Sequence, residues 1–344
     1  MPLRNSKMIY ISLFLLLLLF SFTFYASCET KKESAAQENT LNTPMVLSNP
    51  NASKEAVKVY EYIKSIYGTK ILSGQQESTW MDSPDYEMKY LMEKTGKLPA
   101  IRGLDYINRD FRGVNNRALK WWKEGGLVSI CWHWGIPPNG VGYESSKGTI
   151  NLSEALTRGS ELYEGMMKQM DETAQYLLKL QEAGVPVLWR PFHEFDGAWF
   201  WWGKGGPDAF KKLWRLMYDR YTNYWGLNNL IWVLGYSHTL QSGWYPGDEY
   251  VDIVGSDTYD NTTHIAGYNF LKDIADPGKP RALHENGRIP LPSELQEDGA
   301  EWVWFLTWHT GHLTGENNPQ DTQDLKTVYN DDYVITLDEL PSFK

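Results

Sequence analysis

Eight short apolar runs alternate with longer amphipathic segments between residues 70 and 309, and this alternation constrains the fold more than any other feature. The runs are residues 70–75, 98–105, 127–134, 186–194, 230–236, 251–259, 280–286 and 302–309. Segments of helical period lie between them, at residues 85–95, 115–123, 153–183 and 207–224. Strands that alternate with helices in this way are typical of βαβ units and a parallel sheet.

Eight strand–helix repeats fit a single (β/α)8 TIM barrel of the α/β class, which typically takes roughly 250 residues. A doubly wound sheet is the alternative, but the first run is not followed by the Gly-rich G-x-G-x-x-G turn that is common in that fold. Residues 53–67 form another amphipathic segment, which we expect to be a helix that caps the barrel floor. The sequence therefore predicts a single (β/α)8 catalytic domain over residues 45–344.

Residues 1–28 are typical of a targeting element that plays no part in the fold. Basic residues precede an apolar run at residues 8–24, and Ala26 and Ser27 then lead to Cys28. Small residues before a cysteine at this place resemble a bacterial lipobox, in which the cysteine carries the lipid. A plain signal peptide or an uncleaved anchor helix is the alternative.

The segment that follows Cys28, residues 29–44, is polar and has almost no large apolar side chain, so it is predicted to be a disordered tether. We therefore expect an exported outer-membrane lipoprotein of a Gram-negative bacterium, facing either the periplasm or the exterior. The only membrane attachment is the expected lipid on Cys28, and the protein is expected to be a monomer.

The formal net charge of -10 argues against a nucleic-acid partner, because phosphate contacts need a basic patch. Only two cysteines occur, and Cys131 lies within an apolar run, so we predict that it is a buried thiol rather than a nucleophile. Aromatic residues make up 14% of the chain, with 16 Trp and 21 Tyr. This exceeds what a core usually needs, and we expect the surplus to line a binding surface.

Active sites of TIM barrels lie at the C-terminal ends of the strands, so the ends of the eight runs are the places to search. Polar and aromatic side chains collect there. They are Gln75, Gln76, Asp105, His133, Trp134, His193, Glu194, Asp257, Tyr259, His284, Glu285, Trp308 and His309.

Two glutamates stand out because Glu194 ends the fourth run and Glu285 ends the seventh. Strands four and seven face each other across a barrel, and retaining glycoside hydrolysis needs two carboxyl groups about 5–5.5 Å apart. Glu194 adjoins the indole-rich residues 199–202, and apolar enclosure suits a proton donor. Glu285 is expected to stay ionised through hydrogen bonds from Tyr259 and other donors. We predict Glu194 as acid/base and Glu285 as nucleophile.

A metal site is the competing interpretation, because His133, His193, His284 and His309 all lie at strand ends. Metal-dependent barrels do use such histidines, but the first strand lacks an H-x-H pair. The two glutamates supply a complete mechanism, so we expect neither a metal nor another cofactor.

Four segments together resemble glycoside hydrolase family 26, whose members are chiefly β-1,4-mannanases on barrels with catalytic glutamates after strands four and seven. The segments are residues 190–194 (RPFHE), 199–203 (WFWWG), 257–259 (DTY) and 283–287 (LHENG). Related families usually have Asn where His193 stands. The resemblance implies the two glutamate roles above. It also implies that five further residues surround the sugar at the cleavage point: His133, His193, Trp199, Tyr259 and Trp308.

The expected activity is thus retaining hydrolysis of β-1,4-mannosidic bonds in mannan, glucomannan or galactomannan, with such a polysaccharide or oligosaccharide as the partner. Hydrolysis of another β-glycan, such as mixed-linkage glucan or xylan, is the alternative among enzymes. A glycan-binding lipoprotein without activity is the alternative from another class, and it would not need both Glu194 and Glu285. Endo or exo action, the number of subsites and the tolerance of galactose branches stay open.

Overall fold

The computed structural model describes residues 47–314 and 322–343. The expected lipidation site Cys28 and the tether at residues 29–44 lie outside the described residues. Within the described ranges, no helix combines the length and the apolar character needed to cross a bilayer.

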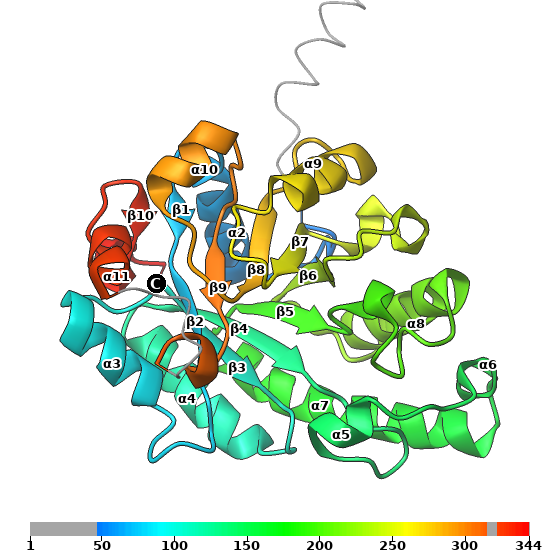
Figure 1. Cartoon of the computed structure of the whole chain (residues 1–344). Helices are drawn as coiled ribbons and strands as arrows, with labels where there is room; N and C mark the ends of the chain where they lie inside the picture. Colours follow the sequence, from blue (N-terminus) through cyan, green and yellow to red (C-terminus); the bar gives the residue numbers. More distant parts are fainter. Residues whose placement is uncertain (1–46, 315–321, 344) are drawn as a thin grey trace, which may run out of the picture. The chain divides into compact units, whose positions relative to one another are not determined.

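Eight parallel strands close into one barrel, in the order in which they follow one another along the chain (Figure 1). They are β2 (Gly74–Gln76), β3 (Ile101–Asp105), β4 (Leu127–Trp132), β5 (Val187–Pro191), β6 (Leu230–Tyr236), β7 (Ile253–Thr258), β8 (Arg281–Asn286) and β9 (Phe305–Thr307). The last strand pairs with the first through Thr307 and Gln75, which closes the barrel. The predicted (β/α)8 fold is confirmed.

Helices flank the strands on the outside of the barrel (Figure 1). The main ones are α2 (Lys54–Ile66), α3 (Tyr86–Thr95), α4 (Phe111–Lys123), α7 (Glu161–Glu182), α8 (Pro207–Asp219), α9 (Ile265–Ile274), α10 (Pro292–Asp298) and α11 (Thr322–Tyr329), and the short α5 (Gly142–Ser146) and α6 (Leu152–Ala155) lie in the β4–α7 connection. The sequence marks several of their starts. Ser53 and Ser160, for example, cap α2 and α7 by accepting hydrogen bonds from Ala56 N and Tyr163 N.

The first predicted strand is divided in the structure. Its first part, β1 (Ile71–Leu72), leaves the barrel and pairs with β10 (Val334–Ile335) in a separate two-stranded sheet, while β2 alone enters the barrel. The division lies just before Gly74, where a Cβ atom would approach the carbonyl oxygen of Phe305 to 2.5 Å. Only glycine permits this close approach to the last strand.

The predicted helix at residues 153–183 is also divided, into α6 and α7. Gly159 lies between them with a φ of 84°, a left-handed conformation that a continuous helix does not allow, and Ser160 then caps α7. The helical period continues across the break, which is why the sequence pattern alone suggests one long helix.

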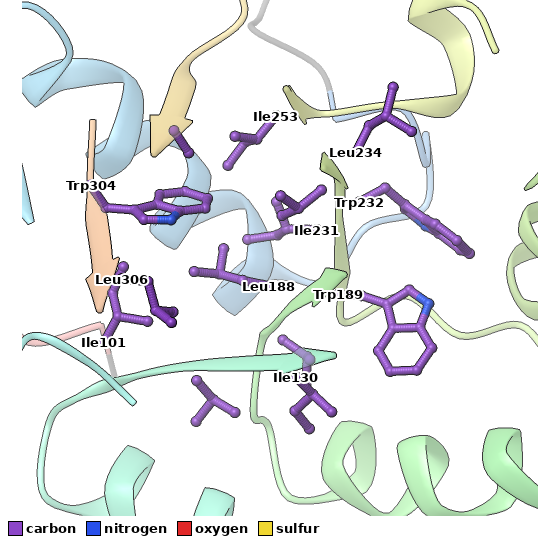
Figure 2. Packing of buried hydrophobic residues seen from close by; sticks show 14 of the residues in the cluster. Ile101, Ile130, Leu188, Trp189, Ile231, Trp232, Leu234, Ile253, Trp304 and Leu306 are labelled. Carbon is purple, nitrogen blue, oxygen red and sulfur yellow. The ribbon is translucent and has the colours of Figure 1, made fainter. Parts of the chain in front are cut away.

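The barrel core follows the two-residue period of its strands. Figure 2 shows Leu188 and Ile231 directed to one side of β5 and β6, and the next residues, Trp189 and Trp232, directed to the opposite side. Trp232 packs edge-to-face on Trp214 of α8, with ring centroids 5.7 Å apart. Large indoles therefore fill the layer between strands and helices.

This packing corrects the expectation that the aromatic surplus lines a binding surface. Half of the 16 tryptophans are almost completely buried. They are Trp134, Trp189, Trp201, Trp202, Trp214, Trp232, Trp302 and Trp304. Most of the indole content thus stabilises the fold, and only a small remainder is available to a ligand.

Candidate active site

A cavity of about 670 Å³ opens at the C-terminal ends of the barrel strands. Its lining comes from the loops after six of the eight strands and from the C-terminal ends of the strands themselves. The lining residues are Gln76, Glu77, Thr79, Trp80, Asp105, Ile107, His133, Tyr143, Glu194, Phe200, Tyr259, Glu285, Trp308, His309 and His312. Most of the strand-end residues that the sequence singles out therefore meet in one cavity.

Glu194 reaches this cavity through a tight turn after β5. Phe192 and Glu194 both have a φ of 54°, a left-handed conformation that is uncommon for residues other than glycine. The amide of Glu194 donates to the carbonyl of Gly235 on β6 at 2.8 Å, which fixes the turn against the next strand. The indole Nε1 of Trp199 donates to Glu194 Oε2 at 2.7 Å. This hydrogen bond to one of its two oxygens holds the Glu194 carboxyl group in place.

Glu285 lies within β8 and is almost buried. The guanidinium of Arg190 on β5 donates to Glu285 Oε2 at 2.9 Å, and the Tyr259 hydroxyl donates to Oε1 at 2.5 Å. The sequence predicts the Tyr259 donor. It does not identify the Arg190 donor, although an arginine inside an apolar strand is a signal that it faces a buried acid.

The two glutamates are close together, since carboxylate oxygens of Glu194, Asp257 and Glu285 all lie within 4.8 Å of one another. This spacing agrees with the roughly 5–5.5 Å separation of retaining glycosidases and is too short for the water molecule that inverting enzymes place between their carboxyl groups.

The pKa of Glu285 is raised to about 7, first by burial and then by the neighbouring Glu194 carboxylate. Arg190, Tyr259 and His133 act in the opposite direction. The expected hydrogen bonds to Glu285 are present, but burial and a like charge outweigh them in setting its pKa. These donors nevertheless favour the ionised form of Glu285.

Asp257 lies beneath this pair and is only 1% exposed. Burial, and then the charge of Glu194, raise the pKa of Asp257 well above the usual range, which favours its neutral form.

His133 is held in one orientation by Asp105. Its Nδ1 lies 2.5 Å from Asp105 Oδ2, and its backbone amide donates to Oδ1 of the same residue. The pKa of His133 is raised; burial alone lowers it, but Asp105 and the two glutamates together outweigh that effect. The Nε2 atom lies 3.2 Å from Nε2 of His193.

Of the five predicted sugar contacts, His193 and Trp199 do not line the cavity. His193 is 1% exposed and packs against His133, and Trp202 Nε1 donates to its backbone carbonyl. Burial lowers its pKa well below the ordinary value. His193 lies in the turn after β5, between Phe192 and Glu194 with their left-handed backbone, and this turn directs its side chain away from the cavity. We interpret His193 as support for the His133 ring.

Trp308 and Tyr259 line the cavity as predicted, but Trp199 does not. The Trp199 indole lies nearly parallel to His238, with ring centroids 6.1 Å apart, and its polar edge faces Glu194. Its position therefore suits a hydrogen-bond donor to the acid more than a stacking surface. Tyr143 and Phe200 contribute further aromatic walls that the sequence does not identify.

Among the residues that the structure describes, two groups of side chains have donor atoms close enough for a metal ion. One is Asp105, Cys131 and His133, and the other is formed by the three carboxyl groups of Glu194, Asp257 and Glu285. The first group contains a buried thiol whose pKa is raised well above its usual range, mainly by burial, which disfavours the thiolate that a metal requires. In the second group, the carboxylates already accept hydrogen bonds from protein donors. Trp199 donates to Glu194, and Arg190 and Tyr259 donate to Glu285.

A model of glycosyl hydrolase family 26 matches residues 48–339. A mannan endo-1,4-beta-mannosidase of Thermothelomyces thermophilus is 39% identical over 320 residues, which cover 87% of this chain. The match covers 64% of the length of that relative. A match to a Piromyces mannan endo-1,4-beta-mannosidase A covers 53% of the length of that protein. The chain thus corresponds to less than two thirds of these relatives.

Solved structures agree with this match. A Podospora anserina beta-(1,4)-mannanase superposes with a TM-score of 0.78 at 36% identity, covering 88% of this chain and 70% of that one. A beta-mannanase from a symbiotic protist of the termite Reticulitermes speratus, complexed with gluco-manno-oligosaccharide, gives 0.80 at 31% identity, covering 88% and 99%. With the barrel and its paired glutamates, these matches show that the chain belongs to glycosyl hydrolase family 26.

Proposed function

We propose that this protein hydrolyses β-1,4-mannosidic bonds in mannan, glucomannan or galactomannan and retains the anomeric configuration. The observation that carries the proposal is the pair Glu194 and Glu285, whose oxygens lie within 4.8 Å at the C-terminal ends of the fourth and seventh barrel strands. Relatives at 39% and 36% identity are named mannan endo-1,4-beta-mannosidases, which supports mannan over other β-glycans.

The first step of the proposed reaction joins the sugar to the protein. Glu285 Oε attacks the anomeric carbon and forms a glycosyl ester, while the bond from that carbon to the glycosidic oxygen breaks. Glu194 transfers its proton to the departing oxygen, which leaves as the hydroxyl of the shortened chain. Glu194 is then a carboxylate.

The second step reverses these roles. Glu194 takes a proton from a water molecule, and the water oxygen attacks the anomeric carbon and displaces Glu285. The glycosyl ester breaks, the sugar leaves with its original configuration, and Glu194 is again protonated. No cofactor takes part in either step.

The hydrogen bonds around the pair support this assignment of roles. Glu285 receives bonds from a cationic guanidinium and a hydroxyl, both of which stabilise a carboxylate ready to attack. Glu194 receives one bond from the neutral indole of Trp199. His133, Tyr259 and Trp308 surround the same space, where they would contact the sugar that reacts.

Replacement of each glutamate tests the mechanism. Glu285→Ala should abolish turnover of mannan yet still bind manno-oligosaccharides, as measured by calorimetry. Glu194→Ala should still react with an aryl β-mannoside that carries a good leaving group, and mass spectrometry should detect the trapped glycosyl ester. Glu297→Ala, an exposed glutamate on α10, is the control and should behave as the wild type. Full activity of Glu285→Ala would refute the proposal.

Substrate class is tested separately from mechanism. We expect turnover of mannan and galactomannan, monitored by chromatography of the products, to exceed turnover of mixed-linkage glucan or xylan. A preference for glucan or xylan would support the alternative enzyme activity. Binding of mannan without hydrolysis by the wild type would support a capture protein instead.

We further propose that the protein is exported and anchored to the outer membrane of a Gram-negative bacterium as a monomer through lipid on Cys28. The support is the basic and apolar leader followed by Ala26, Ser27 and Cys28. Cys28→Ser should move the protein from the membrane fraction to the soluble fraction of cells, and Cys131→Ser should not. Membrane attachment that survives Cys28→Ser would contradict the lipid anchor.

A further inference from the structure

The strand that carries Glu285 contains one residue more than the strands on either side of it. Along β7 and β8, the pairing advances by one residue on β7, from Ser256 to Asp257, and by two on β8, from Leu283 to Glu285. His284 stands between these two residues of β8 without a counterpart on β7. The pairing with β9 shows the same excess, because β8 advances by three residues where β9 advances by two. Both neighbouring strands thus indicate a β-bulge in β8.

The bulge decides the direction of the Glu285 side chain. In a regular strand, consecutive side chains point to opposite faces, so His284 and Glu285 could not both point into the barrel. In this structure both do. Glu285 lines the cavity, and the His284 ring lies against Gly235, which shares the interior face of β6 with Ile231 (Figure 2). The extra residue therefore turns Glu285 from the helix side of the sheet to the active site.

Two glycines make room for the His284 ring inside the barrel. A Cβ atom at Gly235 would approach Nε2, Cε1 and Cδ2 of the ring to 2.6, 2.7 and 3.0 Å. A Cβ atom at Gly255 of β7 would lie 2.9 Å from Cδ2. The two glycines are paired across β6 and β7, so the imidazole covers a place where neither strand has a side chain.

One hydrogen bond and complete burial fix the orientation of the ring. Nε2 of His284 lies 3.1 Å from the carbonyl oxygen of Tyr236 on β6, and a carbonyl oxygen only accepts, so Nε2 carries the hydrogen. The side chain is 0% exposed. Burial, and then the positive charge of Arg190, lower its pKa well below the ordinary value. The ring is therefore neutral near pH 7 and places no second cation beside Arg190.

We propose that His284 is a positioning residue for the nucleophile. Its ring, packed on two glycines and bonded to a carbonyl of β6, holds the bulge in β8 and keeps the Glu285 carboxylate directed at the anomeric carbon. Arg190 and Tyr259 bind the carboxylate itself, whereas His284 acts through the backbone. The inference rests on the proposed function, because it concerns the nucleophile of that reaction.

The first test compares two amide side chains of different reach. The amide nitrogen of glutamine is as many bonds from Cα as Nε2 of histidine, and that of asparagine is one bond closer. With an aryl β-mannoside that has a good leaving group, His284→Ala and His284→Asn should lower kcat/KM about a hundredfold, because the nucleophile is misplaced. His284→Gln should recover about tenfold of this loss. Calorimetry should give a Kd for manno-oligosaccharides within about threefold of the wild type in all three.

The second test examines the contact between the ring and β6. Gly235→Ala places a methyl group against the His284 ring, and every atom that this group would meet most closely belongs to that ring. The substitution should therefore lower kcat/KM as His284→Ala does. In the double variant the methyl group meets no ring, so its kcat/KM should be no lower than that of His284→Ala alone. Such non-additivity would show that both changes act through one contact.

His264→Ala is the matched control. His264 is also a buried histidine, but it bonds to Ser256 Oγ and packs against Gly267 of α9, outside the barrel. Its loss should leave kcat/KM within about twofold of the wild type. Circular dichroism checks that each variant is folded, and if His284→Ala is not, the Gln and Asn variants and Gly235→Ala decide the outcome.

Three results would overturn the positioning role while leaving the proposed function intact. They are a kcat/KM like that of the wild type in His284→Asn, equal losses in the Gln and Asn variants, and additive losses in the double variant. A wild-type protein that hydrolyses neither the aryl β-mannoside nor mannan would instead refute both.

Discussion

The hydroxyl of Tyr259 should control the pH range in which the glutamate pair works. It donates to Glu285 Oε1 at 2.5 Å, and a hydrogen bond to a charged group contributes about 1.5–3 kcal/mol. A protonated Glu285 would receive a weaker bond, of about 0.5–1.5 kcal/mol. Tyr259→Phe therefore disfavours the ionised form of Glu285 by about 1–1.5 kcal/mol, which corresponds to about one pH unit.

The sign of the effect follows from the charge of Glu285 in the proposed mechanism. Glu285 attacks in its ionised form, and burial and the Glu194 carboxylate already raise its pKa to about 7. Loss of a donor that stabilises the carboxylate raises this pKa further, so the rise of activity with pH should move about one unit to higher pH. At a pH below both pKa values, kcat/KM should fall by about tenfold, because a smaller fraction of Glu285 is ionised.

The assay is kcat/KM against pH for the wild type and Tyr259→Phe with one aryl β-mannoside. Tyr143→Phe is the control, because Tyr143 lines the same cavity and its hydroxyl has no hydrogen bond to either glutamate. Its profile should match the wild type in position. A Tyr259→Phe profile that keeps its position, or that moves to lower pH, would show that the hydroxyl does not stabilise the carboxylate.

Two further outcomes follow from other contacts. Trp199→Phe removes the indole donor to Glu194 and should slow mannan hydrolysis about tenfold in steady-state assays. A substrate with an activated leaving group should be affected less. Equal losses on both substrates would argue against a role of Trp199 in acid catalysis. Arg102→Met leaves the buried Glu77 without its main partner and should lower the free energy of unfolding by about 3 kcal/mol, as measured by urea titration. Lys97→Met removes an exposed ion pair with Asp338 and should lower it by less than about 1 kcal/mol. Similar losses in these two variants would refute the importance of the buried pair.

The sequence predicts the barrel and the glutamate pair well because both depend on period and order along the chain. Glu194 and Glu285 are recognised once the runs are counted, since strand number decides which residues face each other in a barrel. Arg190 cannot be recognised in this way. Neighbouring residues of a strand point to opposite faces, and the sequence does not say whether Arg190 or Trp189 points into the barrel. Side-chain direction depends on the shear and register of the closed sheet, which a linear pattern does not contain.

The loops after the strands are harder to predict because their contacts join distant parts of the chain. The bond between Ser78 and Thr310 spans 232 positions, and Glu87, which holds both, lies in a helix that otherwise appears as an ordinary amphipathic segment. A glutamate on the buried face of that helix is the only local signal. A residue of this kind needs partners from elsewhere in the fold, so it points to a network without identifying it.

The turn that delivers Glu194 explains why so many indoles surround the acid yet so few reach the cavity. Left-handed backbone at Phe192 and Glu194 costs on the order of 1–2 kcal/mol at each residue, and the surrounding structure has to offset this. Trp202 Nε1 donates to the carbonyl of His193 at 2.9 Å, and Trp201 Nε1 donates to the carbonyl of Trp134 at 2.7 Å. These buried indoles hold the backbone on both sides of the turn. The cluster at residues 199–202 thus serves the site indirectly, because it holds the turn that carries Glu194 in place.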